Sequence, residues 1–216
     1  MSEGSHRERM DAFWEARTKV ADPVLSTHFK RDGTHELDLG FVRRFTRSDA
    51  RVLDLGAGSC LVSGKLAAGE EVADVLAVDK FPEFLSHAPR HPRLRTEASD
   101  LLAFETTERF DLVLLFGVMN YFSPDEARLL YGRCARWLSP GGVLVVKHQC
   151  GVHEDVTVDR HSEQIGAHYL AFYRHVAREE ALLREKFGSV EVVDVYPPEK
   201  NPWPNTHFYA FVCRAP

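Results

Sequence analysis

The sequence predicts an α/β fold: a seven-stranded, mostly parallel sheet with helices on both faces and one antiparallel strand near the C-terminal end. Two observations lead to this prediction. Between residues 51 and 148, short apolar runs alternate with helical patterns, which is typical of parallel strands joined by right-handed crossovers. Near the C-terminus, VEVVDVY and THFYAFVC are separated only by a Pro-rich connection, so these two strands must pair antiparallel or lie apart.

Five strands are expected in the first part of the chain. The clearest is 112–116, which is apolar at every position, as in a strand that is covered on both faces. The others are expected at 52–55, at 75–78 with Asp79 at its end, before Ser99-Asp100, and at 143–147, after a turn at 140–142.

Helices are expected between and around these strands. One begins at Pro124, because Ser123 is a good N-cap and acidic residues fill the first turn. Another begins after Ser59 as N-cap, and further helices are expected at 7–20, 36–46 and 160–187. The last of these would place three histidines, seven residues apart, in one row beside its apolar stripe: His161, His168 and His175.

The composition indicates one soluble domain with a sizeable core. Of 216 residues, 44% are hydrophobic and 27% charged, and the net charge of −5 argues against a broad nucleic-acid footprint. No apolar run has the length of a membrane span, and the charged N-terminus lacks a signal-peptide core, so we expect a cytoplasmic protein. We expect a helical lid segment at 1–47 and a binding domain at 48–216.

The most informative motif is RVLDLGAGSC at residues 51–60, a strand followed at once by a glycine turn. Gly56 and Gly58 let the backbone bend sharply and approach a ligand. A dinucleotide fingerprint needs a third glycine where this chain has Leu61, and the ending of a phosphate loop is absent. Asp54 beside the turn therefore suits a ligand that has an ammonium group and no phosphate.

VLDLGAGSC resembles the first motif of the class I S-adenosylmethionine (SAM) methyltransferases, V-L-D-[LIV]-G-x-G-x-G. It departs only at the last position, where Cys60 replaces glycine. The order of elements, with its closing antiparallel strand, agrees with this family, and the resemblance extends over about residues 48–214. It implies SAM as the cofactor and methyl transfer as the reaction.

The resemblance also implies a cofactor site at the carboxyl ends of the strands, where open α/β sheets bind ligands. At the first strand the methionine end of SAM would lie, Asp79 would bind the ribose hydroxyls, and the end of the third strand would hold the adenine. The candidate residues are Asp54, Gly56, Ala57, Gly58, Asp79, Lys80, Ser99, Asp100, Leu101, Phe116 and Gly117. The plainer interpretation of each acid is a turn former or helix cap.

The acceptor is expected beyond the fourth strand, beside Asn120 and Tyr121. Related enzymes often carry a histidine where Asn120 stands. An amide takes no proton at neutral pH but can orient an acceptor, which favours an amine or a base elsewhere. His148, at the end of the fifth strand, is the candidate for that base. Tyr121 is equally well explained as a core residue.

We therefore expect methyl transfer to an amine or hydroxyl of a small molecule such as a sugar, amino acid or natural-product intermediate. The alternatives are SAM chemistry without methyl transfer, such as cyclisation, and a non-catalytic SAM-binding partner. We expect no metal, no nucleic acid and no membrane as partners, and a monomer or homodimer. A mixed ion site from the His-rich segment is disfavoured because its loop-borne ligands (His148, His153, Glu154, Asp155, His161) have no recognised spacing.

Overall fold

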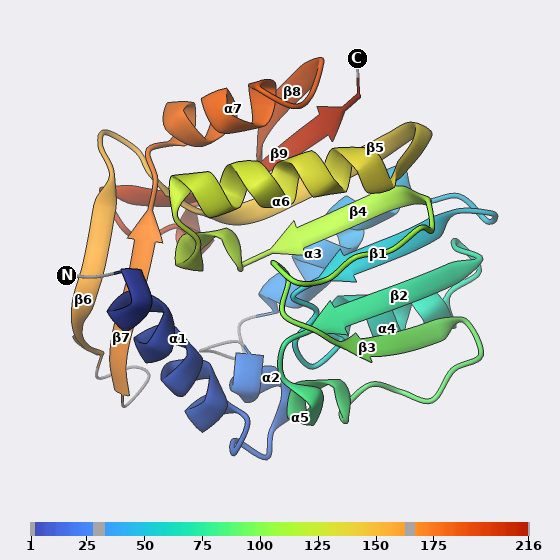
Figure 1. Ribbon diagram of the computed structural model, residues 1–216, viewed down its shortest axis with the longest axis horizontal. Coiled ribbons are helices and arrows are strands. Elements are labelled where there is room, and N and C mark those ends of the chain that lie inside the picture. The colour runs from blue at the N-terminus through green and yellow to red at the C-terminus, as the bar shows by residue number, and fades with distance from the viewer. Residues whose placement is uncertain (1–2, 28–32, 163–166, 216) are drawn as a thin grey trace.

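A seven-stranded sheet forms the centre of the computed structural model, which describes residues 3–27, 33–162 and 167–215 (Figure 1). Its strand order is β3-β2-β1-β4-β5-β9-β8. Only β9 runs antiparallel to its neighbours, β5 and β8. The strands are β1 (Arg51–Leu55), β2 (Asp74–Asp79), β3 (Leu94–Ala98), β4 (Phe110–Phe116), β5 (Leu138–Gly151), β8 (Ser189–Asp194) and β9 (Thr206–Arg214). The predicted fold class is thereby confirmed.

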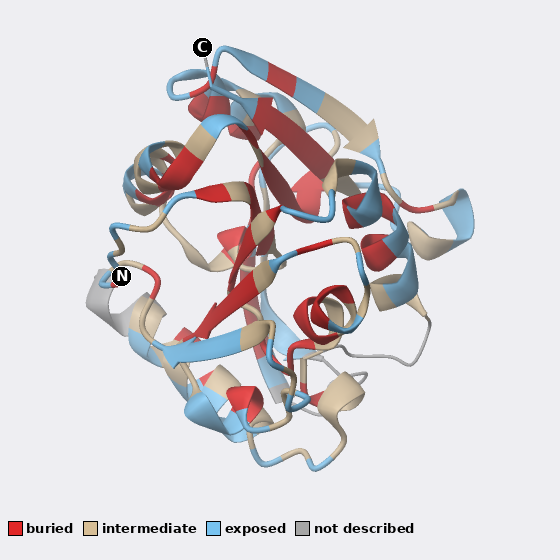
Figure 2. Ribbon diagram, turned by 90° about the vertical axis from the view of Figure 1, so that its right-hand side faces the viewer, coloured by how far each residue is buried: buried red, intermediate tan, exposed pale blue. Residues whose placement is uncertain are grey.

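Two helical layers cover the sheet and enclose its buried strands (Figure 2). Helices α3 (Thr34–Val42) and α4 (Leu61–Ala68) pack against one face through residues such as Leu39 and Leu66. Helices α6 (Pro124–Trp137) and α7 (Val176–Arg184) pack against the other through Leu130 and Leu183. Among the described residues, no helix is both long and apolar enough to cross a membrane.

The start of α6 follows the sequence prediction. Ser123 Oγ accepts a hydrogen bond from the Glu126 amide (3.3 Å), and Glu126 Oε2 accepts one from the Ser123 amide (2.8 Å). This reciprocal capping box satisfies two amides that a helix start leaves without partners. Helix α3 is shorter than predicted, because its last turn tightens into a 3-10 helix at Arg43–Phe45.

The predicted helix at 160–187 is wrong over its first half. Residues Val156–Ser162 (β6) and Ala167–Tyr173 (β7) form an antiparallel hairpin, and only Val176–Arg184 is helical. His161 therefore lies opposite His168 across the hairpin, not in a helical row. Valines and aromatic residues favour strands, and apolar spacing alone does not separate a short strand from a short helix.

The hairpin and the N-terminal helix α1 (Glu3–Arg17) lie side by side over the carboxyl ends of the parallel strands (Figure 1). Met10 and Phe13 of α1 pack against Tyr169 and Tyr173 of β7 in a separate hydrophobic cluster. The short helices α2 (Pro23–Thr27) and α5 (Pro82–Leu85) lie near the same edge. Within the predicted lid segment, α1 covers this edge, whereas α3 belongs to the core.

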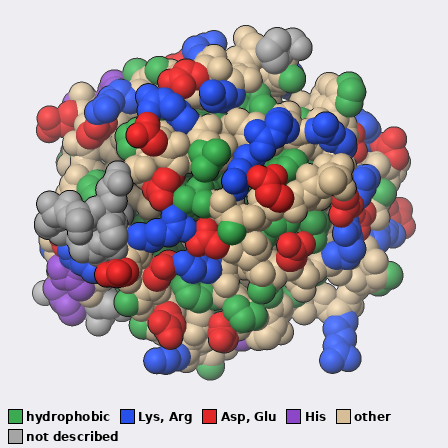
Figure 3. Space-filling view, viewed as in Figure 1, with side chains coloured by type: hydrophobic (Ala, Val, Ile, Leu, Met, Phe, Trp, Pro, Cys, Tyr) green, Lys and Arg blue, Asp and Glu red, His purple; other side chains and the backbone are tan. Residues whose placement is uncertain are grey.

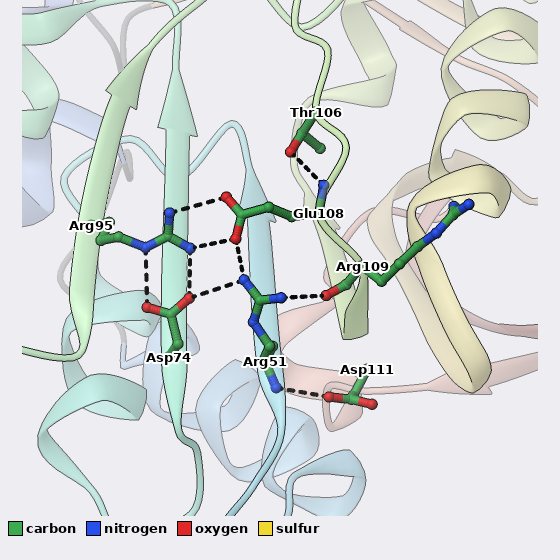
Figure 4. Close-up of polar contacts among 7 residues, drawn as sticks. All are labelled: Arg51, Asp74, Arg95, Thr106, Glu108, Arg109 and Asp111. Carbon is green, nitrogen blue, oxygen red and sulfur yellow. Dashed lines mark hydrogen bonds and ion pairs between the residues drawn. The ribbon is translucent and has the colours of Figure 1, made fainter.

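The opposite edge of the sheet carries a network of ion pairs (Figure 4). Arg95 on β3 donates to Asp74 at the start of β2 (2.6 Å) and to Glu108 before β4 (3.1 Å), and Arg51 on β1 also pairs with Glu108. These side chains are partly exposed, so each ion pair contributes at most about 1 kcal/mol to the stability of the fold. Figure 3 shows acidic and basic side chains mixed over the face in view, without a large field of one sign.

Candidate active site

A cavity of about 930 Å³ lies beneath α1 and the hairpin, at the carboxyl ends of β1, β2, β4 and β5. Ligand pockets span about 300–1,000 Å³, so this one lies near the upper end of that range. It brings together twelve of the fourteen predicted site residues: Asp54, Gly56, Ala57, Gly58, Asp79, Lys80, Asp100, Leu101, Phe116, Gly117, Asn120 and Tyr121. Ser99 and His148 stand outside its lining.

The glycine turn after β1 passes unusually close to its neighbours. The amides of Gly56 and Ala57 donate to the Val78 carbonyl (2.8 and 3.0 Å), which ties the turn to β2. A Cβ on Gly56 would lie 2.2 Å from Val118 Cγ1, and one on Gly58 would lie 2.6 Å from Thr27 Cγ2. Both glycines have positive φ, so no other residue fits without a shift of backbone or neighbours.

Cys60 stands at the one position where the motif departs from the family pattern. Its φ is 57°, in the left-handed region, as in Gly56 and Gly58 before it. This backbone conformation explains why the family pattern has glycine at this position, since glycine adopts it without strain. Cys60, not Ser59 as predicted, is also the N-cap of α4; the Ser59 hydroxyl is buried against that of Ser26 (2.8 Å).

We expect Cys60→Gly to be more stable than Cys60→Ala by about 1 kcal/mol, because both lose the buried thiol but only glycine relieves the left-handed backbone. In an ordinary helix this order is reversed. Thermal or urea unfolding of the two variants measures the difference. An alanine variant at least as stable as the glycine variant would show that the backbone relaxes here at no cost.

Two buried carboxylates face the cavity beside this turn. Burial raises the pKa of Asp54 to about 6, although a hydrogen bond from the Ser63 hydroxyl opposes it and the charge of Asp79 adds to it. Burial also raises the pKa of Asp79, against the hydrogen bonds that it accepts from the amides of Phe81 (3.0 Å) and Gly58 (2.8 Å). Two desolvated carboxylates in one cavity attract a cation.

Asp100, at the proposed adenine end of the cavity, forms ion pairs with two basic side chains. Its Oδ2 lies 2.5 Å from Arg7 Nη2 and 3.2 Å from Lys80 Nζ, and its Oδ1 accepts from the Leu102 amide (2.9 Å). Burial alone would raise the pKa of Asp100, but these partners lower it. Lys80 also reaches Asp11 of α1 (2.6 Å), so ion pairs join α1 to this wall of the cavity.

Asn120 and Tyr121 follow β4 in a 3-10 turn at Met119–Tyr121. Asn120 is 5% exposed, and its Oδ1 has no hydrogen-bond partner among the described residues. Since N and O of an amide are assigned by their partners, the finding is an unsatisfied amide at the cavity wall. Tyr121 contacts Trp14 of α1 (5.6 Å between ring centroids), and its hydroxyl lies 3.4 Å from that of Tyr169. Tyr121 thus joins the cavity wall to the lid.

The expectation that His148 faces the crevice is wrong. His148 is 1% exposed, stacks on Phe211 and lies 3.6 Å from Glu179 Oε2, on the side of the sheet that α6 and α7 cover. Successive side chains of a strand point to opposite faces. Because β5 continues regularly to Gly151, Lys147 and Gln149 line the cavity instead.

Sequence reasoning missed several polar residues of the cavity, above all Asp38, Lys147, Gln149 and Tyr196. Strand alternation past residue 147 was the available signal for Lys147 and Gln149. The loop at 201–207 also contributes to the cavity, whose lining includes Trp203 and Thr206. Among the described residues, no three His, Cys, Asp or Glu side chains gather as a metal site.

Comparison with known proteins matches this architecture. Residues 52–142 match the model of a methyltransferase domain. This match agrees with the predicted resemblance to the class I methyltransferases. The predicted resemblance to these enzymes is thereby confirmed, and the fold is shared with solved methyltransferase structures.

Relatives of this chain include the ubiquinone biosynthesis O-methyltransferase of Xylella fastidiosa (strain M23), 34% identical over 111 residues, 48% of this chain and 44% of that protein. The carboxy-S-adenosyl-L-methionine synthase of Cronobacter sakazakii is 25% identical over 121 residues, 52% of this chain and 49% of that protein. The chain spans about half the length of the curated relatives it matches. The solved structure of DhpI with SAH has the same fold over both whole chains (TM-score 0.74, 19% identity).

Proposed function

We propose that this chain transfers a methyl group from SAM to an amine or hydroxyl of a small molecule. When bound, SAM supplies an activated methyl on its sulfonium sulfur. The glycine turn would hold its methionine end, with Asp54 close to the ammonium, and Asp79 would bind the ribose. Two observations support this fit: the glycine turn lines the cavity with Gly56 and Gly58 in positive-φ conformations, and two desolvated carboxylates lie beside it.

The observation that carries the proposed reaction is the unsatisfied amide of Asn120 at the cavity wall. A buried polar group without a partner costs about 1–3 kcal/mol, so a ligand that hydrogen-bonds it gains that energy. An acceptor N–H or O–H that donates to this amide would have its lone pair held in a fixed direction. Such alignment supplies much of the acceleration in a displacement on an already activated methyl.

The cover formed by helix α1 and the β6–β7 hairpin favours a small acceptor that is enclosed away from water. Helix α1 and the β6–β7 hairpin close over the cavity through Met10, Phe13, Tyr169 and Tyr173. We propose that α1 and the hairpin open to admit both ligands. The likeness to the carboxy-S-adenosyl-L-methionine synthase favours a second candidate, SAM chemistry without methyl transfer to a separate acceptor.

The test separates binding, side chemistry and transfer. We expect one SAM per chain by isothermal titration, no methylthioadenosine when SAM is incubated with the protein alone, and S-adenosylhomocysteine once an amine or hydroxyl acceptor is added. Asn120→Ala should lower turnover about tenfold or more, with SAM affinity unchanged within twofold. Methylthioadenosine formed without acceptor, or a modified SAM as the product, would favour the second candidate, and absence of SAM binding would reject both.

A further inference from the structure

Three polar side chains from distant parts of the sequence meet at the wall of the cavity. Lys147 Nζ on β5 donates to Asp38 Oδ2 of α3 (2.6 Å) and to the Tyr196 hydroxyl (2.7 Å), and that hydroxyl donates to Asp38 Oδ1 (2.8 Å). Lys147 is 6% exposed and Asp38 2%. All three line the cavity, next to Phe116 at the end of β4.

This triad is charge-neutral as a whole. Burial alone would lower the pKa of Lys147, but Asp38 and Tyr196 outweigh it and raise that pKa, so the ammonium stays charged. Burial raises the pKa of Tyr196, so the phenol keeps its proton. One cation and one anion therefore remain in contact. An anionic ligand would meet the Asp38 carboxylate and a cationic one the ammonium, so neither charge is favoured.

The triad and its neighbour nevertheless present open hydrogen-bonding groups. An ammonium has three donors, and the described residues supply acceptors for two of those of Lys147. Gln149, two residues along the same face of β5, donates through Nε2 to Thr206 Oγ1 (2.7 Å), while its Oε1 has no partner among the described residues. The cavity wall thus offers one open donor beside one open acceptor.

Aromatic rings surround this polar pair. Lys147 Nζ lies 5.0 Å from the ring centroid of Phe116 and 5.8 Å from that of Phe208. Tyr196 and Trp203 pack on Phe208, with centroids 5.3 and 6.2 Å away. A flat ring fits such walls, and a hydroxyl is the neutral group that both accepts and donates a hydrogen bond.

We propose that Asp38, Lys147, Tyr196 and Gln149 form the acceptor subsite, and that it binds a neutral ring bearing neighbouring hydroxyls. This inference rests on the proposed function and deepens it, since it selects an uncharged hydroxylated ring over carboxylate-bearing or amine-bearing acceptors. Lys147 and Gln149 hold the hydroxyls, while Asp38 cancels the charge and Tyr196 fixes the geometry.

The experiment measures fragment binding to the protein saturated with S-adenosylhomocysteine, by ligand-observed NMR titration. The probes are catechol, benzoate and benzylamine, which share one ring and differ in charge. We expect catechol to bind at least tenfold more tightly than the other two. The double variant Lys147→Met/Asp38→Asn should weaken catechol about tenfold or more. Its matched control is Lys65→Met/Glu36→Gln, which removes an ion pair on the outer surface of α3 and α4 and should change nothing.

Tyr196→Phe serves if the double variant does not fold, because it keeps the Lys147–Asp38 pair; it should also weaken catechol severalfold while affinity for S-adenosylhomocysteine stays within twofold. Preference for benzoate or benzylamine, equal losses in test and control variants, or no catechol binding to a chain that binds S-adenosylhomocysteine would each overturn the subsite. Failure to bind S-adenosylhomocysteine would count against the proposed function.

Discussion

Replacing Glu179 by alanine is expected to lower the free energy of unfolding by about 3–5 kcal/mol, because it leaves a buried guanidinium without its counter-charge. Glu179 is 0% exposed. It accepts hydrogen bonds from Arg174 Nε and the Tyr131 hydroxyl, and His148 lies 3.6 Å away. The control is Glu180→Ala, on the same helix, which removes only a surface pair with Arg184 (2.6 Å) and should cost less than 1 kcal/mol.

The pH dependence of this loss distinguishes an ion pair from simple packing. Burial alone would raise the pKa of Glu179, but His148 and Arg174 outweigh it and hold the pKa well below its usual range. A lowered pKa stabilises the fold above the unfolded value of about 4.3, and that contribution is lost as the pH falls toward the folded value. The stability gap between wild type and Glu179→Ala, from urea unfolding, should therefore narrow below about pH 4. A gap that is small at pH 7, or constant down to pH 3, would contradict the assignment.

Replacing Asp79 by alanine is expected to weaken SAM binding about 10- to 100-fold, the range for a lost hydrogen bond to a charged group. Besides its proposed contact with the ribose, Asp79 accepts hydrogen bonds from the amides of Gly58 and Phe81, so it also stabilises the glycine turn. Isothermal titration of wild type and variant with SAM measures the change. The SAM affinity of Asp79→Asn should lie between those of wild type and Asp79→Ala, since the single amide oxygen can keep one of the two backbone hydrogen bonds.

A matched control for this prediction lies at the other end of the same strand. Asp74→Asn, in the ion-pair network at the far edge of the sheet, should leave SAM affinity unchanged within twofold. If Asp79→Ala bound SAM as wild type does, the ribose would have to lie elsewhere in the cavity. If both variants lost affinity equally, the effect would be general destabilisation.

Most of the fold followed from patterns that are local in the sequence. The apolar run of β4, the glycine turn after β1 and the capping box at Ser123 each depend on residues close together in the chain. Parallel topology then brings the strand ends to one edge, so Asp54, Asp79, Asp100 and Asn120 could be placed in one cavity from the sequence. What failed depended on choices that local patterns leave open.

These failures have different causes. The β6–β7 hairpin packs against α1 through aromatic side chains of β7, and Tyr169 is 156 residues from Phe13 in the chain. His148 was assigned to the wrong face of β5, because a difference of one residue along a strand moves a side chain to the other face. The triad of Asp38, Lys147 and Tyr196 joins three separate elements, and none of the three stands out in the sequence alone.

Helix α1 touches both ends of the cavity at once. Through Arg7 it holds Asp100 at the proposed adenine end, and through Met10 and Phe13 it packs on the hairpin over the acceptor end. One helix therefore covers part of both compartments, and the proposed opening of α1 and the hairpin would uncover both. Spent cofactor and methylated product would then depart in the same opening event, with one shared rate constant that falls as the ion pairs of Arg7 and Lys80 strengthen at low ionic strength.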